Sequence, residues 1–131
     1  PEDDSTDIRI RFYESGVEES AGVYLFSFEY MVATGSRQEV DRTRSSYLRA
    51  TFNTGNATNE KAHSYNYFYN LGNSGKYSFH TMQTVLIQNN SNLNVAFGGG
   101  LLPQTSTVNK IKLYNTGNFS CTANLYGVKQ I

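Results

Sequence analysis

The stretch VYLFSFEYMV, residues 23–32, decides the fold of this protein. Every second residue in it is aromatic, so Tyr24, Phe26, Phe28 and Tyr30 share one face of an extended chain. The opposite face is mixed, with a serine and a glutamate among apolar residues. Alternation of this kind predicts a β-strand with one face in a core and the other face partly open to solvent.

Seven further segments have the length and the apolar alternation of strands. They are residues 8–13, 47–52, 64–70, 77–88, 93–97, 108–114 and 120–128. We expect the two NTGN sequences, at residues 53–56 and 115–118, to form hairpin turns, and the glycines at 98–100 to end a strand. The sequence therefore predicts an all-β protein, an antiparallel β-sandwich or jelly roll.

The composition fits a single domain over residues 1–131, with residues 1–7 as a loose acidic N-terminal segment. The 11 basic residues balance the 11 acidic ones, so the formal net charge is zero. A neutral chain has no overall field that attracts nucleic acid, and no apolar run approaches the roughly 20 residues of a membrane span. We expect no nucleic-acid partner and no membrane insertion.

Residues suited to catalysis or metal binding form no motif in this sequence. His63 and His80 lie in no zinc-binding pattern, and the single cysteine, Cys121, lies in phase with Ala123 and Leu125 as a small core residue would. A carboxylate pair such as Glu29 and Asp41 could flank a sugar bond, but no motif supports it. We expect no enzyme activity, no metal ion and no cofactor.

Two groups of residues are candidates for a binding or interface role. The first is a row of tyrosines on one face of a predicted strand, Tyr65, Tyr67 and Tyr69. They would face the core, fill a subunit interface or stack on sugar rings, and the last two interpretations are favoured because three buried hydroxyls would each need a partner. The second group is a basic stretch with Arg37, Arg42, Arg44 and Arg49. It is a solvated face paired with the acidic front of the chain, a subunit contact or an anion-binding strip.

The end of the chain carries the most specific pattern. A strand over residues 120–128 would place Leu125 in the core and tie down the terminus, since unpaired termini fray. The sequence VNKIKLYNTGNFSCTANLYGVK, residues 108–129, resembles the C-terminal signature of a family of tailed-bacteriophage virion proteins. Those chains carry an I-x-x-I-x-L strand, a G-N-F turn and a closing L-Y-G-[IV]-K strand, and their F-G-S-G-L-W element resembles AFGGGLL here. The matching residues are Phe97, Val108, Ile111, Leu113, Gly117, Asn118, Phe119, Leu125, Tyr126, Gly127, Val128 and Lys129.

The resemblance implies a β-jelly roll, tumour-necrosis-factor-like, that assembles as a homotrimer and is displayed on the exterior of the capsid or tail. It implies structural roles for the matching residues, including a buried pair of Tyr126 and Gly127. Such domains form the tips of tail fibres and needles or decorate the capsid, and they bind other virion proteins or a host-surface glycan. Two alternatives from other classes are a free carbohydrate-binding module and, less favoured, a glycan-cleaving enzyme.

Overall fold

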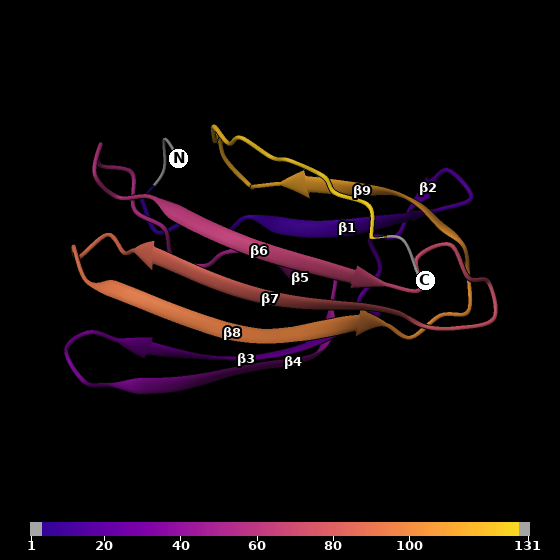
Figure 1. The fold of residues 1–131 in the computed structure, drawn as a ribbon, viewed down its shortest axis with the longest axis horizontal. Coiled ribbons are helices and arrows are strands. Elements are labelled where there is room, and N and C mark those ends of the chain that lie inside the picture. Colours follow the sequence, from indigo (N-terminus) through magenta and orange to yellow (C-terminus); the bar gives the residue numbers. More distant parts are fainter. Residues whose placement is uncertain (1–3, 129–131) are drawn as a thin grey trace.

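The structure, a computed structural model, describes residues 4–128, and this part of the chain forms nine β-strands and no helix. All strand pairs are antiparallel, and the strands form two sheets (Figure 1). The strands are β1 (Arg9–Glu14), β2 (Val17–Glu18), β3 (Tyr24–Val32), β4 (Arg37–Ser45), β5 (Leu48–Arg49), β6 (Ala62–Tyr69), β7 (Ser78–Ile87), β8 (Leu93–Leu102) and β9 (Val108–Tyr114).

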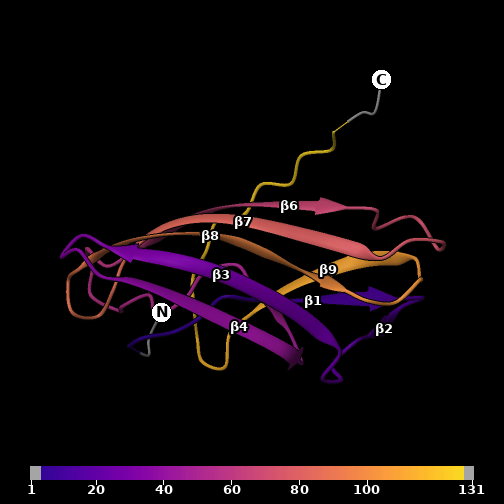
Figure 2. The same ribbon diagram turned by 90° about the horizontal axis from the view of Figure 1, so that it is seen from below.

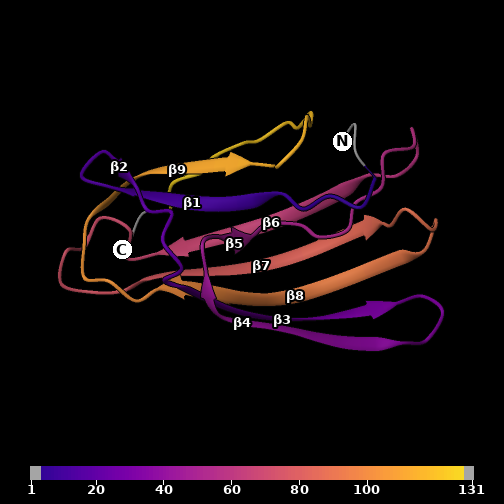
Figure 3. The same ribbon diagram turned by 180° about the vertical axis from the view of Figure 1, so that it is seen from behind.

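The larger sheet has five strands in the order β4-β3-β8-β7-β6. In the smaller sheet, β1 has β9 on one side and β2 and β5 on the other (Figure 3). The chain passes between the sheets from β2 to β3, from β4 to β5, from β5 to β6 and from β8 to β9, whereas β6, β7 and β8 follow one another in one sheet (Figure 2). Buried side chains from both sheets form one core, which confirms the predicted antiparallel β-sandwich.

Aromatic side chains of β3 form the centre of that core, as the alternation in residues 23–32 predicts. Tyr24, Phe26, Phe28 and Tyr30 are all buried. The ring centroid of Phe52, from the chain after β5, lies 5.2 Å from that of Phe28 and 4.8 Å from that of Tyr30. Each such ring buries roughly 150–250 Å² of surface, so these contacts supply a large part of the hydrophobic stabilisation of the sandwich.

One buried hydroxyl connects β3 to the small sheet. The Tyr24 hydroxyl accepts a hydrogen bond of 3.0 Å from the Phe12 amide and donates one of 3.0 Å to the Glu19 carbonyl. Burial raises the pKa of Tyr24 to about 12, because the phenolate would lose its hydration there. The aromatic core therefore includes a tyrosine whose polar end is satisfied.

The triple glycine lies inside β8, so the prediction that residues 98–100 end a strand is wrong. A Cβ atom at Gly98 would collide with Phe28, and one at Gly100 would lie 2.6 Å from Cδ2 of Leu48 and 2.8 Å from Cβ of Phe26. Such approaches are closer than carbon atoms tolerate. The glycines therefore let β8 pack closely against its neighbours, a role that glycine has in strand interiors.

Two other parts of the chain differ from the expected elements. The predicted strand over residues 47–52 contains only the two-residue β5, although Phe52 is buried. The first NTGN sequence is not a hairpin turn, because Thr54 makes isolated bridges to Thr6 and Gln88 from distant parts of the chain. The second NTGN follows β9 and leads to no paired strand.

The start of the described chain is held more firmly than expected for a loose segment over residues 1–7. Thr6 and Thr54 exchange two backbone hydrogen bonds of 3.0 and 2.9 Å. Oδ2 of Asp7 lies 3.1 Å from Nη2 of Arg49. The expectation is therefore wrong for Thr6 and Asp7, and residues 1–3 lie outside the described residues.

The predicted closing strand is not formed in the described chain. Residues 120–128 are exposed, with Leu125 at 87% and Tyr126 at 81%, so Leu125 is not a core residue and Tyr126 and Gly127 are not a buried pair. Cys121 is exposed rather than packed in the core. Figure 2 shows this segment, in yellow, running outward past β6 and away from both sheets. Apolar alternation indicates that a segment can pair, but a strand also needs a partner edge, and this segment has none here.

We expect Gly100→Ala to lower the free energy of unfolding by about 1–3 kcal/mol, the usual cost of overpacking a core. The added methyl group would meet the side chains of Leu48 and Phe26. The matched control is Gly72→Ala, since no atom lies within 4 Å of a Cβ built there. Urea unfolding of the three proteins measures the difference, and equal midpoints for Gly100→Ala and Gly72→Ala would contradict the close packing of β8.

Candidate functional site

The outer face of β6 carries the row of tyrosines that the sequence singles out. Tyr65, Tyr67 and Tyr69 are 70%, 55% and 49% exposed, whereas the residues between them face the core side. The structure therefore contradicts the interpretation of these tyrosines as core residues. The two other interpretations, a subunit interface or a ligand face, both need this exposure.

The row continues across the neighbouring strands. In the register of the sheet, Tyr65 lies beside Gln83 and then Phe97, and Tyr69 lies beside Phe79. Adjacent positions on one face of a sheet bring Cβ atoms to about 4.5–5.5 Å, so these side chains form one surface. We call this surface the aromatic face. Its exposed apolar members are Tyr65, Tyr67, Tyr69, Phe79, Val85 and Phe97.

Polar contacts on the inner side of β6 fix the direction in which its tyrosines point. The Ser64 hydroxyl lies 2.8 Å from the Ala50 carbonyl, to which it donates a hydrogen bond. Nε2 of His80 lies 2.9 Å from Oδ1 of Asn66, and the rings of His80 and Phe68 stack at 5.2 Å. Burial lowers the pKa of His80 to about 4, so the imidazole is neutral at physiological pH. These bonds hold β6 in the register that exposes the tyrosines.

A shallow hollow lies at one end of the aromatic face, where β6 leads into β7. It has a volume of about 420 Å³, and Phe79 belongs both to its lining and to the aromatic face. The lining residues are Asn70, Gly75, Lys76, Tyr77, Phe79 and Thr105. The hollow adds amide, hydroxyl and ammonium groups next to the aromatic side chains.

The predicted basic stretch does not form one strip. Arg37, Arg42 and Arg44 are exposed on the edge strand β4, where Arg37 forms an ion pair with Glu29. Arg49 lies on β5 in the other sheet, pairs with Asp7 and has its guanidinium 5.8 Å from the ring centroid of Phe28. The interpretation of paired charges fits Arg49, and a single anion-binding strip over residues 37–49 is contradicted by this separation.

Chemistry-bearing side chains do not gather into a catalytic or metal centre in the described part of the chain. Glu29 and Asp41 lie on neighbouring strands, but Glu29 pairs with Arg37 and Asp41 accepts a hydrogen bond of 2.6 Å from Ser27. Among residues 4–128, no three His, Cys, Asp or Glu side chains are placed to hold a metal ion. No helix in these residues is long and apolar enough to cross a membrane.

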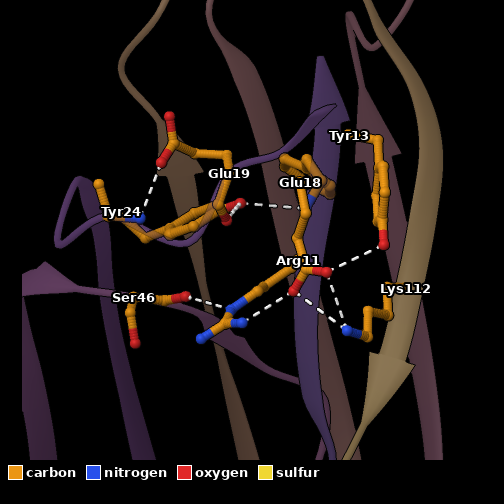
Figure 4. A network of polar contacts seen from close by, with 9 residues as sticks. Arg11, Tyr13, Glu18, Glu19, Tyr24, Ser46 and Lys112 are labelled. Carbon is orange, nitrogen blue, oxygen red and sulfur yellow. Dashed lines mark hydrogen bonds and ion pairs between the residues drawn. The ribbon is translucent and has the colours of Figure 1, made fainter. Parts of the chain in front are cut away.

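A charge network that sequence reasoning missed lies on the outer face of the small sheet (Figure 4). Glu18 accepts hydrogen bonds from Arg11 at 2.8 Å, from Tyr13 at 2.9 Å and from Lys112 at 2.9 and 3.1 Å. The guanidinium of Arg11 also donates to the Ser46 carbonyl at 2.8 Å. Charged residues alternate with apolar residues on β1 and β9, so the sequence predicts a strand at each. The sequence does not indicate which of the charged side chains form hydrogen bonds or ion pairs with one another.

The network keeps the Glu18 carboxylate ionised. Hydrogen bonds from Arg11, Lys112 and Tyr13 lower the pKa of Glu18 from 4.5 to about 2. On the same face, the guanidinium of Arg11 lies 4.7 Å from the ring centroid of Tyr114. This face is therefore a set of mutually satisfied charges and rings rather than an open binding site.

The residues of the C-terminal signature fall into separate environments. Val108 is buried, Ile111 and Phe119 are half-buried, and Leu113 and Phe97 are exposed. Gly117 is half-buried and Asn118 is exposed. The structural role that the resemblance implies therefore fits Val108 and Ile111, which lie on β9, better than it fits the closing residues.

No protein family, no curated protein and no solved structure matches this chain.

We expect stability to fall as the pH drops from 4.5 to about 2, in part because Glu18 becomes protonated. The folded state holds this carboxylate at a pKa of about 2, against 4.5 ordinarily, so the unfolded chain takes up the proton first. The stabilisation is fully present above pH 4.5 and is lost as the pH falls through 2. The Tm values of wild type and Glu18→Gln should therefore differ at neutral pH and converge in acid.

The control for this prediction is Glu39→Gln, which changes an exposed glutamate on β4. Its Tm should follow that of the wild type at every pH. A constant difference between wild type and Glu18→Gln over the whole range would contradict the role of the network.

Proposed function

We propose that this chain is a structural module of a bacteriophage virion, displayed on the exterior of the capsid or tail, which acts by binding and not by catalysis. The observation that carries the proposal is the aromatic face. The resemblance of residues 108–129 to tailed-bacteriophage virion proteins supports the virion setting, and the β-sandwich is a fold suited to such a building block.

The aromatic face has the properties of an interaction surface. Contiguous exposed apolar surface is unfavourable in water and marks binding sites when it is large. Tyrosine is enriched in such sites because its ring supplies rigid apolar area and its hydroxyl can bond to a partner or to water. Among the described residues of β6, no acidic or basic side chain other than His63 interrupts the face.

The composition of the face favours a protein partner, either a neighbouring virion protein or a second copy in a homotrimer. Valine and phenylalanine side chains accompany the tyrosines, and Val85 and Phe97 offer no hydrogen bond. A protein surface buries such groups well, and a specific interface covers about 800 Å² on each partner. The aromatic face draws its side chains from three adjacent strands, β6, β7 and β8.

A host-surface glycan is the second candidate ligand, and a specific observation favours it. Thr81 lies directly beside Tyr67, and Gln83 lies beside Tyr65. A hydroxyl or an amide next to an aromatic ring is the combination that holds a sugar, since the ring stacks on C–H groups while the polar group bonds to hydroxyls. The same arrangement would serve a free carbohydrate-binding module.

We expect Tyr67→Ala to weaken binding to virions or host cells several-fold while leaving the Tm unchanged. An aromatic contact contributes about 0.5–1.5 kcal/mol beyond its buried area, and a factor of ten in affinity corresponds to 1.4 kcal/mol. The side chain is 55% exposed, so its removal should cost the isolated fold little. A matched control is Val17→Ala, which removes an exposed apolar side chain from the small sheet.

Three results would separate the interpretations. Unchanged binding by Tyr67→Ala would contradict the proposal that the aromatic face is the binding surface. Competition of binding by purified host glycans would favour the glycan over a virion protein. Hydrolysis of those glycans by the wild-type protein would contradict the non-catalytic role.

A further inference from the structure

The segment that follows the turn after β9 is paired with no strand among the described residues. In residues 119–128, no backbone hydrogen bond reaches any other residue that the structure describes. Phe119 is half-buried and residues 120–128 are exposed. Figure 2 shows the segment leaving the sandwich rather than folding back along β9. We call residues 119–128 the C-terminal arm.

The arm has the sequence of a strand that is buried on one face. Phe119, Cys121, Ala123 and Leu125 alternate with residues that are mostly polar, and the arm holds no charge and no proline. An extended chain would therefore place four apolar side chains on one side. Leaving large apolar groups such as Leu125 in water is unfavourable, so the arm is expected to find a partner.

The two edges of the five-stranded sheet differ in their capacity to accept another strand. β4 carries Arg37, Glu39, Asp41, Arg42 and Arg44, and charges of this density are a common protection against further pairing. β6, at the other edge, has eight residues with no Lys, Arg, Asp, Glu or Pro. In an antiparallel ladder half of the backbone groups of an edge strand point away from the sheet, so β6 offers free donors and acceptors.

The core is also incompletely covered beside β6. Phe68, on the inner side of β6, and Ile111, on β9, are only half-buried, and Leu113 is 38% exposed although its cross-strand partner Ile10 is fully buried. At one end of β6 the chain itself covers the core, because the Val108 amide at the start of β9 donates a hydrogen bond of 2.7 Å to the Leu71 carbonyl just after β6. Along the rest of β6 an apolar strand would extend the core.

We propose that the C-terminal arm of one copy of this chain adds as a strand to the β6 edge of a second copy. Its apolar side would cover Phe68 and the neighbouring core, and its other side would place Tyr126 next to the tyrosines of the aromatic face. Main-chain hydrogen bonds would give affinity, and the alternation would select the register. The alternating part of the arm, residues 119–125, is about as long as β6, Ala62–Tyr69.

The contact is heterologous, because the arm of each copy meets the edge of the next. Heterologous contacts close into rings or continue as filaments, and closure with three copies gives a trimer. The inference deepens the self-association that the proposed function includes and rests on it. It uses a sheet edge, however, whereas the aromatic face is the surface of the sheet, so variants can test the two separately.

The single cysteine reports the position of the arm without engineering. Cys121 is exposed when the arm is unpaired and would face the core of the neighbouring copy when the arm is paired. We expect its labelling by a maleimide to be slowed at least about tenfold in the assembled wild-type protein, and to recover on dilution as the copies separate. Light scattering of the same samples should show the mass falling from trimer to monomer.

Leu125→Asp tests the apolar side of the arm. We expect this variant to be monomeric at concentrations where the wild type is assembled, with rapid labelling of Cys121 at every concentration. Its far-ultraviolet circular dichroism should match that of the dilute wild type, because Leu125 makes no core contact within one copy. The control Val17→Asp places the same charge at an exposed apolar position of the small sheet and should assemble as the wild type does.

Hydrogen exchange identifies the edge. Assembly should slow amide exchange in β6, Ala62–Tyr69, and leave β4, Arg37–Ser45, unchanged. Protection of β4 instead would overturn the assignment to β6. Labelling of Cys121 that is slow at every protein concentration would show that the arm pairs within its own chain. That result would overturn the exchange of arms between copies.

The remaining outcomes separate this inference from the proposed function. Assembly with Cys121 fully reactive would overturn the arm exchange and leave binding through the aromatic face intact. Protection of Cys121 in a Tyr67→Ala variant that has lost no binding would support the arm exchange and contradict the aromatic face. A monomer with reactive Cys121 at all concentrations would overturn the inference.

Discussion

The alternation of side chains across the five-stranded sheet is the constraint on which this structure depends, since each residue faces either the core or the solvent. On β3 the aromatic residues face inward and the outward residues include Ser27 and Glu29. On β6 the arrangement is reversed, because Ser64 and Asn66 face inward and bond to Ala50 and His80 while the tyrosines face outward. A shift of β6 by one residue would bury three tyrosine hydroxyls and break both hydrogen bonds. The register that satisfies the core is thus the same one that creates the aromatic face.

The edges of that sheet follow from a second property of β-structure, which is that an unpaired edge strand invites pairing. The charges of β4 discourage it, whereas β6 has neither charge nor proline. The arm at residues 119–128 pairs with no strand of its own sandwich within residues 4–128. A protein that functions alone would be expected to protect such an edge. A subunit whose edge and outer face are covered by neighbouring copies can instead have an uncharged edge, an unpaired arm and an exposed aromatic face.

Much of this fold could be predicted from the sequence, because β1 and β3 show apolar alternation that matches their burial. On β7 the strand was predictable but not its orientation, since Ser78 and His80 are buried while Phe79 is exposed. β4 could not be predicted, since its charged residues lack alternation and pairing with β3 is what makes it a strand. The glycines of β8 normally signal a break, and only the positions of Phe28 and Leu48 reveal that close approach requires them. Of the candidate site, the tyrosine row was predictable from its spacing, but its extension to Phe79 and Phe97 depends on the strand order. The arm shows most clearly what cannot be predicted from the sequence. Its apolar alternation indicates that the segment can pair as a strand, but it does not indicate whether the partner strand belongs to the same chain or to another copy.

The two outer faces of the sandwich differ in what a ligand would have to displace. On the small sheet, Glu18 already bonds to Arg11, Tyr13 and Lys112, so a ligand that recruited any of these groups would leave another charge unpaired. Leaving a charged group without its partner costs more free energy than a new surface hydrogen bond to the ligand contributes. On the large sheet, Tyr65 and Tyr67 contact mainly water, and covering them releases that water without breaking an internal bond. Binding is therefore favoured on the aromatic face, while the charges of the small sheet hold together β1, β2 and β9.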